Sequence, residues 1–348
     1  MHLRTALAPL TVGLVIASAT LIPAAMPSVA AAAAGACPTP VQTLAIAPTA
    51  ATPNLADPFG IAGDASGNVY VASLSTSTIV KFDSAGTQTM VIEPNAATPT
   101  MGDPQDVVID GSGNIWVTAR DNSRVYEFDA AGTQIGTIAP TAATPNLNEP
   151  EGLALDGAGN VYVSDEGTDT IYRFNSAGVQ TLAIPASGAT PDLVSPEALD
   201  VDAAGNIYTT NYSDSVVYKF NSSGVQTMTI EAADATPNLS QPNGVGVDAA
   251  GNIYVADAGT NTIYRFDSAG TQTLALAATD AKPNFERLEG LSVDAARNIY
   301  VTDGDSNYAY RFCTADAVPV TTTTTSGATT APPAATPAAV TTSPHFTG

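Results

Sequence analysis

Histidine is nearly absent from this 348-residue chain, and the two that occur, His2 and His345, lie close to its ends. A general base or a zinc site built on histidine is therefore excluded for everything between them. Basic residues are also scarce, with 11 Lys and Arg against 33 Asp and Glu and a formal charge of −22. Such a chain repels polyanions, so nucleic acid is not an expected partner, and the acidity is typical of solubility outside a cell.

Long apolar runs are missing after the first residues. Behind MHLR, an apolar run extends from Thr5 to about Ile22, and small residues follow to Ala36. This pattern predicts a secretory signal peptide, with Arg4 as its basic flank and an A-x-A-like cleavage site such as Ser28 to Ala30. A retained membrane helix is the alternative, but the Pro- and Ala-rich stretch behind the run favours processing. We expect a mature chain without a transmembrane span, secreted or in the cell envelope.

Aromatic residues make up only 6% of the chain, whereas Gly and Pro are plentiful, a mixture that suits short strands joined by turns. A block such as DGAGNVYV at 156–163 recurs six times at a constant spacing of 46 residues. Its Asn falls at Asn68, Asn114, Asn160, Asn206, Asn252 and Asn298. A period held so strictly indicates one supersecondary unit repeated six times, as in propellers and solenoids.

One repeat contains four short alternating runs separated by turn residues. In the third copy they are expected at 152–156, 161–164, 170–174 and 179–184. Four antiparallel strands repeated radially predict an all-β, six-bladed β-propeller of four-stranded blades. The run at 41–46 copies 179–184, while the last repeat ends at 310–312 without a fourth strand. We therefore expect the N-terminal strand to close the last blade.

Only two cysteines are present, Cys37 and Cys313, and they stand 276 residues apart, which is six repeat lengths. They occupy the same repeat position at the two cut ends of one blade, so we predict a disulfide that clasps the seam. A redox or metal-binding pair is the functional alternative. A lipid-anchored Cys37 is another, but it would leave Cys313 without a partner, and Ala34 replaces the expected leucine.

The domain organisation follows from these patterns. We expect a signal peptide and processing region at 1–36, a propeller at 37–316 and a tail at 317–348. The tail is rich in Thr, Ala and Pro, lacks any apolar period and is predicted to be disordered, with hydroxyls that could carry O-linked sugars. We expect the protein to be a monomer.

The repeat pattern P-x-G-[IVL]-x-x-D-x-x-G-N-[IV]-Y-V-x-D, followed by a Tyr-Arg-Phe-type strand and a D-x-x-G turn, resembles the NHL-repeat family of six-bladed propellers. The resemblance covers residues 37 to about 316. It implies binding of proteins or RNA, or a sensor role in bacterial envelopes, but also enzyme relatives. These are gluconolactonase-type metal-dependent hydrolases, virginiamycin B lyase and the peptide-amidating lyase. The lyases depend on histidine, which this propeller lacks, whereas the lactonase type needs only carboxylates and amides around a divalent cation.

The six repeats differ from one another mainly in the segments expected on one face of the propeller. The D-x-x-G-N turns are nearly uniform, and we expect them to be structural rather than calcium-binding. The loops between second and third strands vary, as do the residues that open each first strand, which predicts a binding face. The expected binding residues are Arg120, Glu166, Tyr212, Gln105, Asn243 and Glu289.

Two carboxylates, Asp106 and Asp200, replace small or apolar residues of other copies, so they are expected to face the central channel or a partner. In one interpretation they line a water-filled channel, and in the other they bind a ligand or a cation. Glu151, Glu197 and Asp200 are the best trio for Ca²⁺ or another divalent cation, although we expect no cofactor.

The sequence therefore favours an exported, non-catalytic propeller that binds a protein, peptide or glycan on its variable face. A divalent-cation-dependent hydrolase of the lactonase type, with carboxylates at the channel mouth, is the alternative.

Overall fold

Short strands build almost all of the structure. The computed structural model describes residues 40–93, 101–139 and 147–314, all of which belong to one compact unit, 36–348. Within these ranges the chain forms 24 strands and five 3-10 helices, at Pro48–Ala50, Glu166–Thr168, Ala186–Gly188, Ala232–Asp234 and Ala278–Asp280. No helix in this described part is long and apolar enough to cross a membrane.

The strands pair into six antiparallel sheets of four strands, which we call blades 1 to 6. Blades 1 to 3 contain β2 Pro58–Gly63, β3 Val69–Ser73, β4 Thr78–Phe82, β5 Gln88–Ile92, β6 Pro104–Ile109, β7 Ile115–Ala119, β8 Arg124–Phe128, β9 Gln134–Ile138, β10 Pro150–Leu155, β11 Val161–Asp165, β12 Thr170–Phe174 and β13 Gln180–Ile184. Blades 4 to 6 contain β14 Pro196–Val201, β15 Ile207–Asn211, β16 Val216–Phe220, β17 Gln226–Ile230, β18 Pro242–Val247, β19 Ile253–Asp257, β20 Thr262–Phe266, β21 Gln272–Leu276, β22 Leu288–Val293, β23 Asn298–Asp303, β24 Tyr308–Cys313 and β1 Val41–Ile46.

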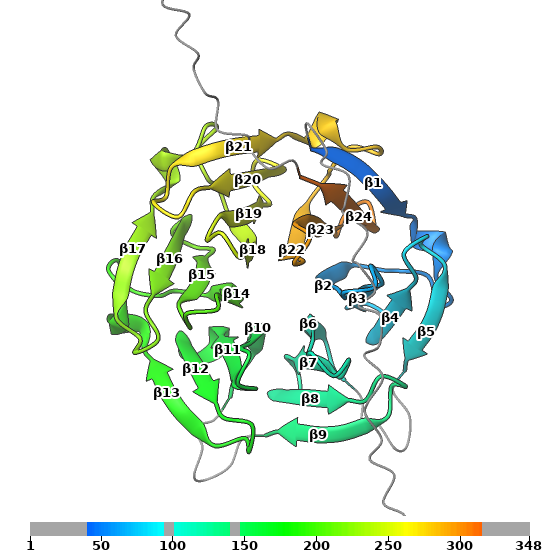
Figure 1. The fold of residues 1–348 in the computed structure, drawn as a ribbon, viewed down its shortest axis with the longest axis horizontal. Coiled ribbons are helices and arrows are strands. Elements are labelled where there is room, and N and C mark those ends of the chain that lie inside the picture. The colour runs from blue at the N-terminus through cyan, green and yellow to red at the C-terminus, as the bar shows by residue number, and fades with distance from the viewer. Residues whose placement is uncertain (1–39, 94–100, 140–146, 315–348) are drawn as a thin grey trace, which may run out of the picture. The chain divides into compact units, whose positions relative to one another are not determined.

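The blades close into a ring, which confirms the predicted six-bladed propeller. The first strands of the blades, β2, β6, β10, β14, β18 and β22, lie around the central axis (Figure 1). Each contacts the next, and β22 contacts β2. The sheet order β1-β24-β23-β22 shows that the N-terminal strand completes blade 6. All six blades therefore have four strands, as the sequence predicts.

The seam places Val41 opposite Cys313 in the β1–β24 ladder. The described residues contain no free cysteine, but Cys37 lies outside them, so its pairing with Cys313 stays a prediction.

We expect the unreduced native protein to titrate with no free thiols, and with two after unfolding in reductant. Reduction should lower the free energy of unfolding by about 4 to 5 kcal/mol, because the bond closes a very long loop. Two reactive thiols in the native protein would contradict the pairing.

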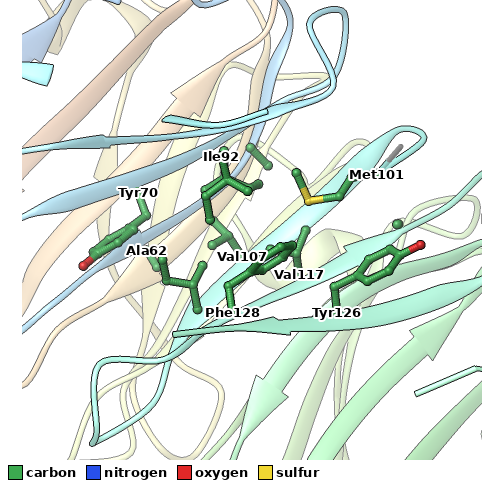
Figure 2. Packing of buried hydrophobic residues seen from close by; sticks show 12 residues of the cluster. Ala62, Tyr70, Ile92, Met101, Val107, Val117, Tyr126 and Phe128 are labelled. Carbon is green, nitrogen blue, oxygen red and sulfur yellow. The ribbon is translucent and has the colours of Figure 1, made fainter. Parts of the chain in front are cut away.

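Apolar packing lies between neighbouring blades. Figure 2 shows one such cluster, in which Tyr70 and Ile92 of blade 1 pack with Val107 and Phe128 of blade 2. Equivalent clusters occupy the other interfaces, so the repeated Tyr and Phe positions are core residues, as predicted. Because every cluster joins two blades, each blade holds its neighbour in place.

The turns between first and second strands, and between third and fourth, form what we call the turn face. In blade 3, Asp156 Oδ1 accepts from the backbone N–H of Asn160 at 2.9 Å and Oδ2 accepts from its side-chain Nδ2 at 2.7 Å. The Tyr162 hydroxyl also donates to this carboxylate at 3.1 Å. The same bonds recur in other blades. Because these carboxylates serve backbone and side chains of their own turns, the turn face is scaffold.

Gly159 has a φ of +78°, in the left-handed region. We expect Gly159→Val to lower the free energy of unfolding by about 1 to 3 kcal/mol, because a β-branched residue is strained there. Gly157→Val is the matched control in the same turn, since nothing lies within 4 Å of an added Cβ at Gly157. Thermal unfolding of both variants checks this, and equal melting temperatures would contradict it.

Candidate functional site

An axial cavity of about 220 Å³ runs between the six first strands. One residue from each blade occupies the equivalent position where its first strand begins. We call this set the mouth ring: Phe59, Gln105, Glu151, Glu197, Asn243 and Glu289. The side with the mouth ring also carries the loops between second and third strands, and we call it the loop face. Because these six residues are not identical, this end of the cavity is chemically asymmetric.

Hydroxyl groups of the second strands fix the mouth ring in place. Thr118 Oγ1 donates to the Glu151 carbonyl of the next blade at 2.6 Å, and Thr210 Oγ1 donates to the Asn243 carbonyl at 3.1 Å. Ser164 makes the same contact with the Glu197 carbonyl. Each hydroxyl also accepts from a backbone N–H of its own first strand. The backbones of these mouth residues are therefore held from two blades.

Arg120 links blades 2 and 3 at the rim. Its guanidinium lies 3.1 Å from Glu149 Oε2 and 3.2 Å from Glu151 Oε1, and it also pairs with Glu166. We call these four residues the Arg120 cluster. Glu151 is only 2% exposed, so Arg120 provides the counter-charge of a buried carboxylate. The sequence predicts both Arg120 and Glu166 as binding residues. The ion pairs show that Arg120 also has a structural role, because it compensates the charge of a buried carboxylate.

A second cluster, which sequence reasoning missed, surrounds Arg287. Its guanidinium lies 3.1 Å from Asp57 Oδ1 of blade 1 and 2.8 Å from Asp305 Oδ1, and it pairs with Glu289. Glu289 is fully buried and accepts a hydrogen bond from Asn243 Nδ2. This Arg287 cluster ties blade 6 to blade 1. It draws two predicted binding residues, Asn243 and Glu289, into one network.

Burial perturbs the acids of the mouth ring. It raises the pKa of Glu197 to about 7; the Glu166 charge adds to the rise and Arg120 opposes it. Burial also raises the pKa of Glu151 well above its ordinary value, with the Glu197 charge adding to it. For Glu289, burial outweighs the nearby Arg287 and raises the pKa to about 8. The mouth therefore holds acids that take up protons near neutral pH.

Asp106 and Asp200 line the cavity, as predicted, but their carboxylates also join blades. Asp106 Oδ2 accepts from the N–H of Leu153 in blade 3 at 2.9 Å, and Asp200 Oδ2 accepts from the N–H of Val247 in blade 5 at 2.7 Å. The other oxygen of each accepts from the N–H of the following residue. Burial raises the pKa of Asp106 to about 7 and that of Asp200 to about 6, despite these amides.

The described residues contain no group of three or more His, Cys, Asp or Glu side chains placed to hold a metal ion. Of the trio expected for a divalent cation, Glu151 pairs with Arg120, and Asp200 accepts two backbone amides. Only Glu197 of the three has a carboxylate without these commitments. A Ca²⁺ site at this trio stays a prediction.

The loops on the loop face are partly structural. Asp165 is fully buried and accepts from the N–H of Asn148 at 2.7 Å and of Thr168 at 3.0 Å. Burial raises its pKa to about 6. Asp257 and Asp303 hold the loops of their blades in the same way. The variable positions free for binding are therefore fewer than the loop sequences suggest.

Tyr212 and Gln105 complete the predicted binding set. Tyr212 is partly buried beside the mouth, and burial raises its pKa, with the charges of Glu197 and Glu289 adding to the rise. Gln105 is buried and donates to Asp103 Oδ2 at 3.2 Å. The structure thus brings all six predicted binding residues to one face of the ring.

Residues 239–266 match the family model described as NHL repeat, which confirms the resemblance on a repeat that has five near-copies in the chain. No curated protein sequence matches the chain significantly.

Solved structures share the fold at low identity. A catalytically inactive histidine-to-alanine variant of virginiamycin B lyase from Staphylococcus aureus, with quinupristin, is 18% identical with a TM-score of 0.54, covering 74% of this chain and 81% of that one. A chain of a nidogen/laminin complex is 22% identical with a TM-score of 0.57, covering 68% and 85%. A protein of unknown function from Bacteroides thetaiotaomicron is 16% identical with a TM-score of 0.58, covering 74% and 70%. At these identities the likeness is one of fold.

Proposed function

We propose that this NHL-repeat propeller is an exported, non-catalytic binding module that holds a polypeptide on its loop face, over the mouth of the axial cavity. The observation that carries the proposal is the difference between its two faces. The turn face repeats one capped turn around the ring, whereas the mouth ring and its loops vary from blade to blade. Loops that vary on a rigid, repeated scaffold are where binding residues are generally found.

A polypeptide is favoured over a glycan by the charge of the site. The mouth ring carries three glutamates, and both arginines near it are occupied by carboxylates of their own clusters. Such an entrance attracts cationic groups, which proteins carry in abundance and neutral sugars do not. Tyr212 adds an aromatic side chain of the type enriched at protein interfaces.

Catalysis receives less support from this site. Histidine, the residue replaced in the inactive lyase structure, occurs here only at positions 2 and 345. Within the described part, Glu151 and Asp200, which a lactonase-type cation would require, are committed to Arg120 and to backbone amides. The hydrolase alternative therefore lacks a ready set of ligands.

Selection of a phage-displayed library of random 12-residue peptides on the immobilised mature protein tests the proposal, with a glycan array probed in parallel. We expect enriched peptides whose binding falls at least tenfold in Tyr212→Ala, with an unchanged melting temperature. Val225→Ala is the control on the turn face, because Val225 is 59% exposed there.

Enrichment that is equally strong on the Tyr212→Ala and wild-type proteins would place binding elsewhere. Glycans bound without peptides would favour a lectin, and turnover in a lactone-hydrolysis screen would favour the hydrolase.

A further inference from the structure

Among the described residues, Glu197 is the glutamate of the mouth ring for which no ion pair is found. Within the described ranges, ion pairs involve Glu149, Glu151 and Glu166 around Arg120, and Glu289 around Arg287, but not Glu197. Glu197 is partly buried and lines the axial cavity. Both nearby arginines are taken, so the Glu197 carboxylate has no protein counter-charge of its own.

Asn243, on the adjacent strand β18, supplies a second unused acceptor. It is 7% exposed and lines the same cavity. Its Nδ2 donates to Glu289, which fixes the orientation of the amide, and its Oδ1 is buried without a hydrogen-bond partner. A buried carbonyl oxygen without a donor destabilises the folded protein, and a bound N–H group would remove that penalty.

The chemistry of these two acceptors selects the ligand. An ionised carboxylate and an amide oxygen, facing a cavity with no free cationic group described near them, favour a hydrogen-bond donor that is also positively charged. Ca²⁺ and Mg²⁺ take six or more oxygen ligands, and the described residues place no group of three or more His, Cys, Asp or Glu side chains for a metal ion. The cavity of about 220 Å³ is large enough for an amino-acid side chain, and its walls include the apolar residues Leu199 and Val245.

We propose that Glu197 and Asn243 form a subsite for a primary ammonium group of a polypeptide, either a lysine side chain or a free N-terminus. The ammonium offers three N–H donors and a charge, which match the Glu197 carboxylate and the Asn243 carbonyl. Tyr212 directly follows β15 in the same blade as Glu197 and is only partly buried. This inference rests on the proposed binding function of the loop face.

Calorimetric titration of the mature protein at pH 8 tests the subsite with three short probes. They are acetyl-Gly-Gly-Lys-Gly-Gly-amide, the same peptide with norleucine in place of lysine, and pentaglycine amide with a free N-terminus. We expect the lysine peptide, the free-amine peptide or both to bind, and the norleucine peptide to bind at least tenfold more weakly. The two amine probes distinguish a side chain from an N-terminus.

Glu197→Gln should weaken binding of the amine probes about 10- to 100-fold. Glutamine suits this position, because Gln105 occupies it in blade 2, and a melting curve verifies folding. Glu231→Gln, at the exposed residue that follows the outermost strand of blade 4, removes the same charge and should leave binding of the amine probes unchanged.

Equal binding of the lysine and norleucine peptides, or undiminished binding in Glu197→Gln, would overturn the subsite. Stoichiometric Ca²⁺ binding that Glu197→Gln abolishes, without binding of any amine probe, would replace it with a metal site. If library peptides bind the loop face but the amine probes do not, the subsite fails while the binding function stands.

Discussion

Replacing Asp165 with alanine is expected to lower the free energy of unfolding by about 3 to 5 kcal/mol and the melting temperature by roughly 6 to 12 °C. The carboxylate is fully buried and accepts hydrogen bonds from the N–H groups of Asn148 and Thr168 and from the Thr168 hydroxyl. Alanine would leave these partly buried donors without their acceptor, and each donor left unsatisfied away from water costs about 1–3 kcal/mol. Thermal and urea unfolding provide the measurement.

The chain itself offers the matched control, because Asn211 holds the same position in blade 4. There Oδ1 accepts from the N–H of Val194 at 3.3 Å, and Nδ2 donates to the Asp192 carbonyl at 3.2 Å. Asp165→Asn should therefore cost less than about 1 kcal/mol. If the alanine and asparagine variants had the same melting temperature, the hydrogen bonds of Asp165 would not stabilise the loop.

A higher melting temperature at pH 5.5 than at pH 8.5, by roughly 5 to 10 °C, is the second large expected effect. Burial raises the pKa of Asp106 to about 7, of Asp200 to about 6 and of Glu289 to about 8. Each acid therefore binds its proton more tightly in the folded protein than in the unfolded chain. Their contribution is fully present below pH 4 and is lost as the pH rises through 6 to 8.

General repulsion within an acidic chain acts in the same direction, so controls must separate the two causes. Salt at 0.5 M screens exposed charges but scarcely affects buried ones, and the pH dependence should therefore survive it. The Asp106→Asn variant should show a shallower slope, because asparagine does not titrate. A melting temperature that stays level from pH 5.5 to 8.5 would contradict the buried-acid interpretation.

The propeller could be predicted from the sequence because its information is local and repeated. The Asp156 to Asn160 turn and the strand at 170–174 recur at a fixed interval, so each copy supports the interpretation of the others. The strand at 41–46 was predicted to the residue, and the first strand of blade 3 began two residues earlier than expected. The same comparison placed the mouth ring on one face.

Contacts between blades were harder to predict. Comparison of copies marked Asp106 and Asp200 as unusual, but not that each would accept an amide N–H from the following blade. That contact depends on the offset between neighbouring strands, which the repeat does not specify. Arg287 did carry a signal, since it is the only basic residue at a position held by Asp57, Asp103, Glu149, Ser195 and Gln241.

The way in which β1 joins blade 6 also determines the order in which the ring can form. β1 is synthesised before every other strand, yet its partner β24 is the last. At roughly 5–20 residues per second, the roughly 260 residues between them take on the order of 13–50 s to emerge from the ribosome. Blades 1 to 5 each have four consecutive strands and can form in turn, but β1 spends that interval as an unpaired edge strand, open to pairing with other chains. Pairing of β1 with β24 is therefore the last step by which the ring can close.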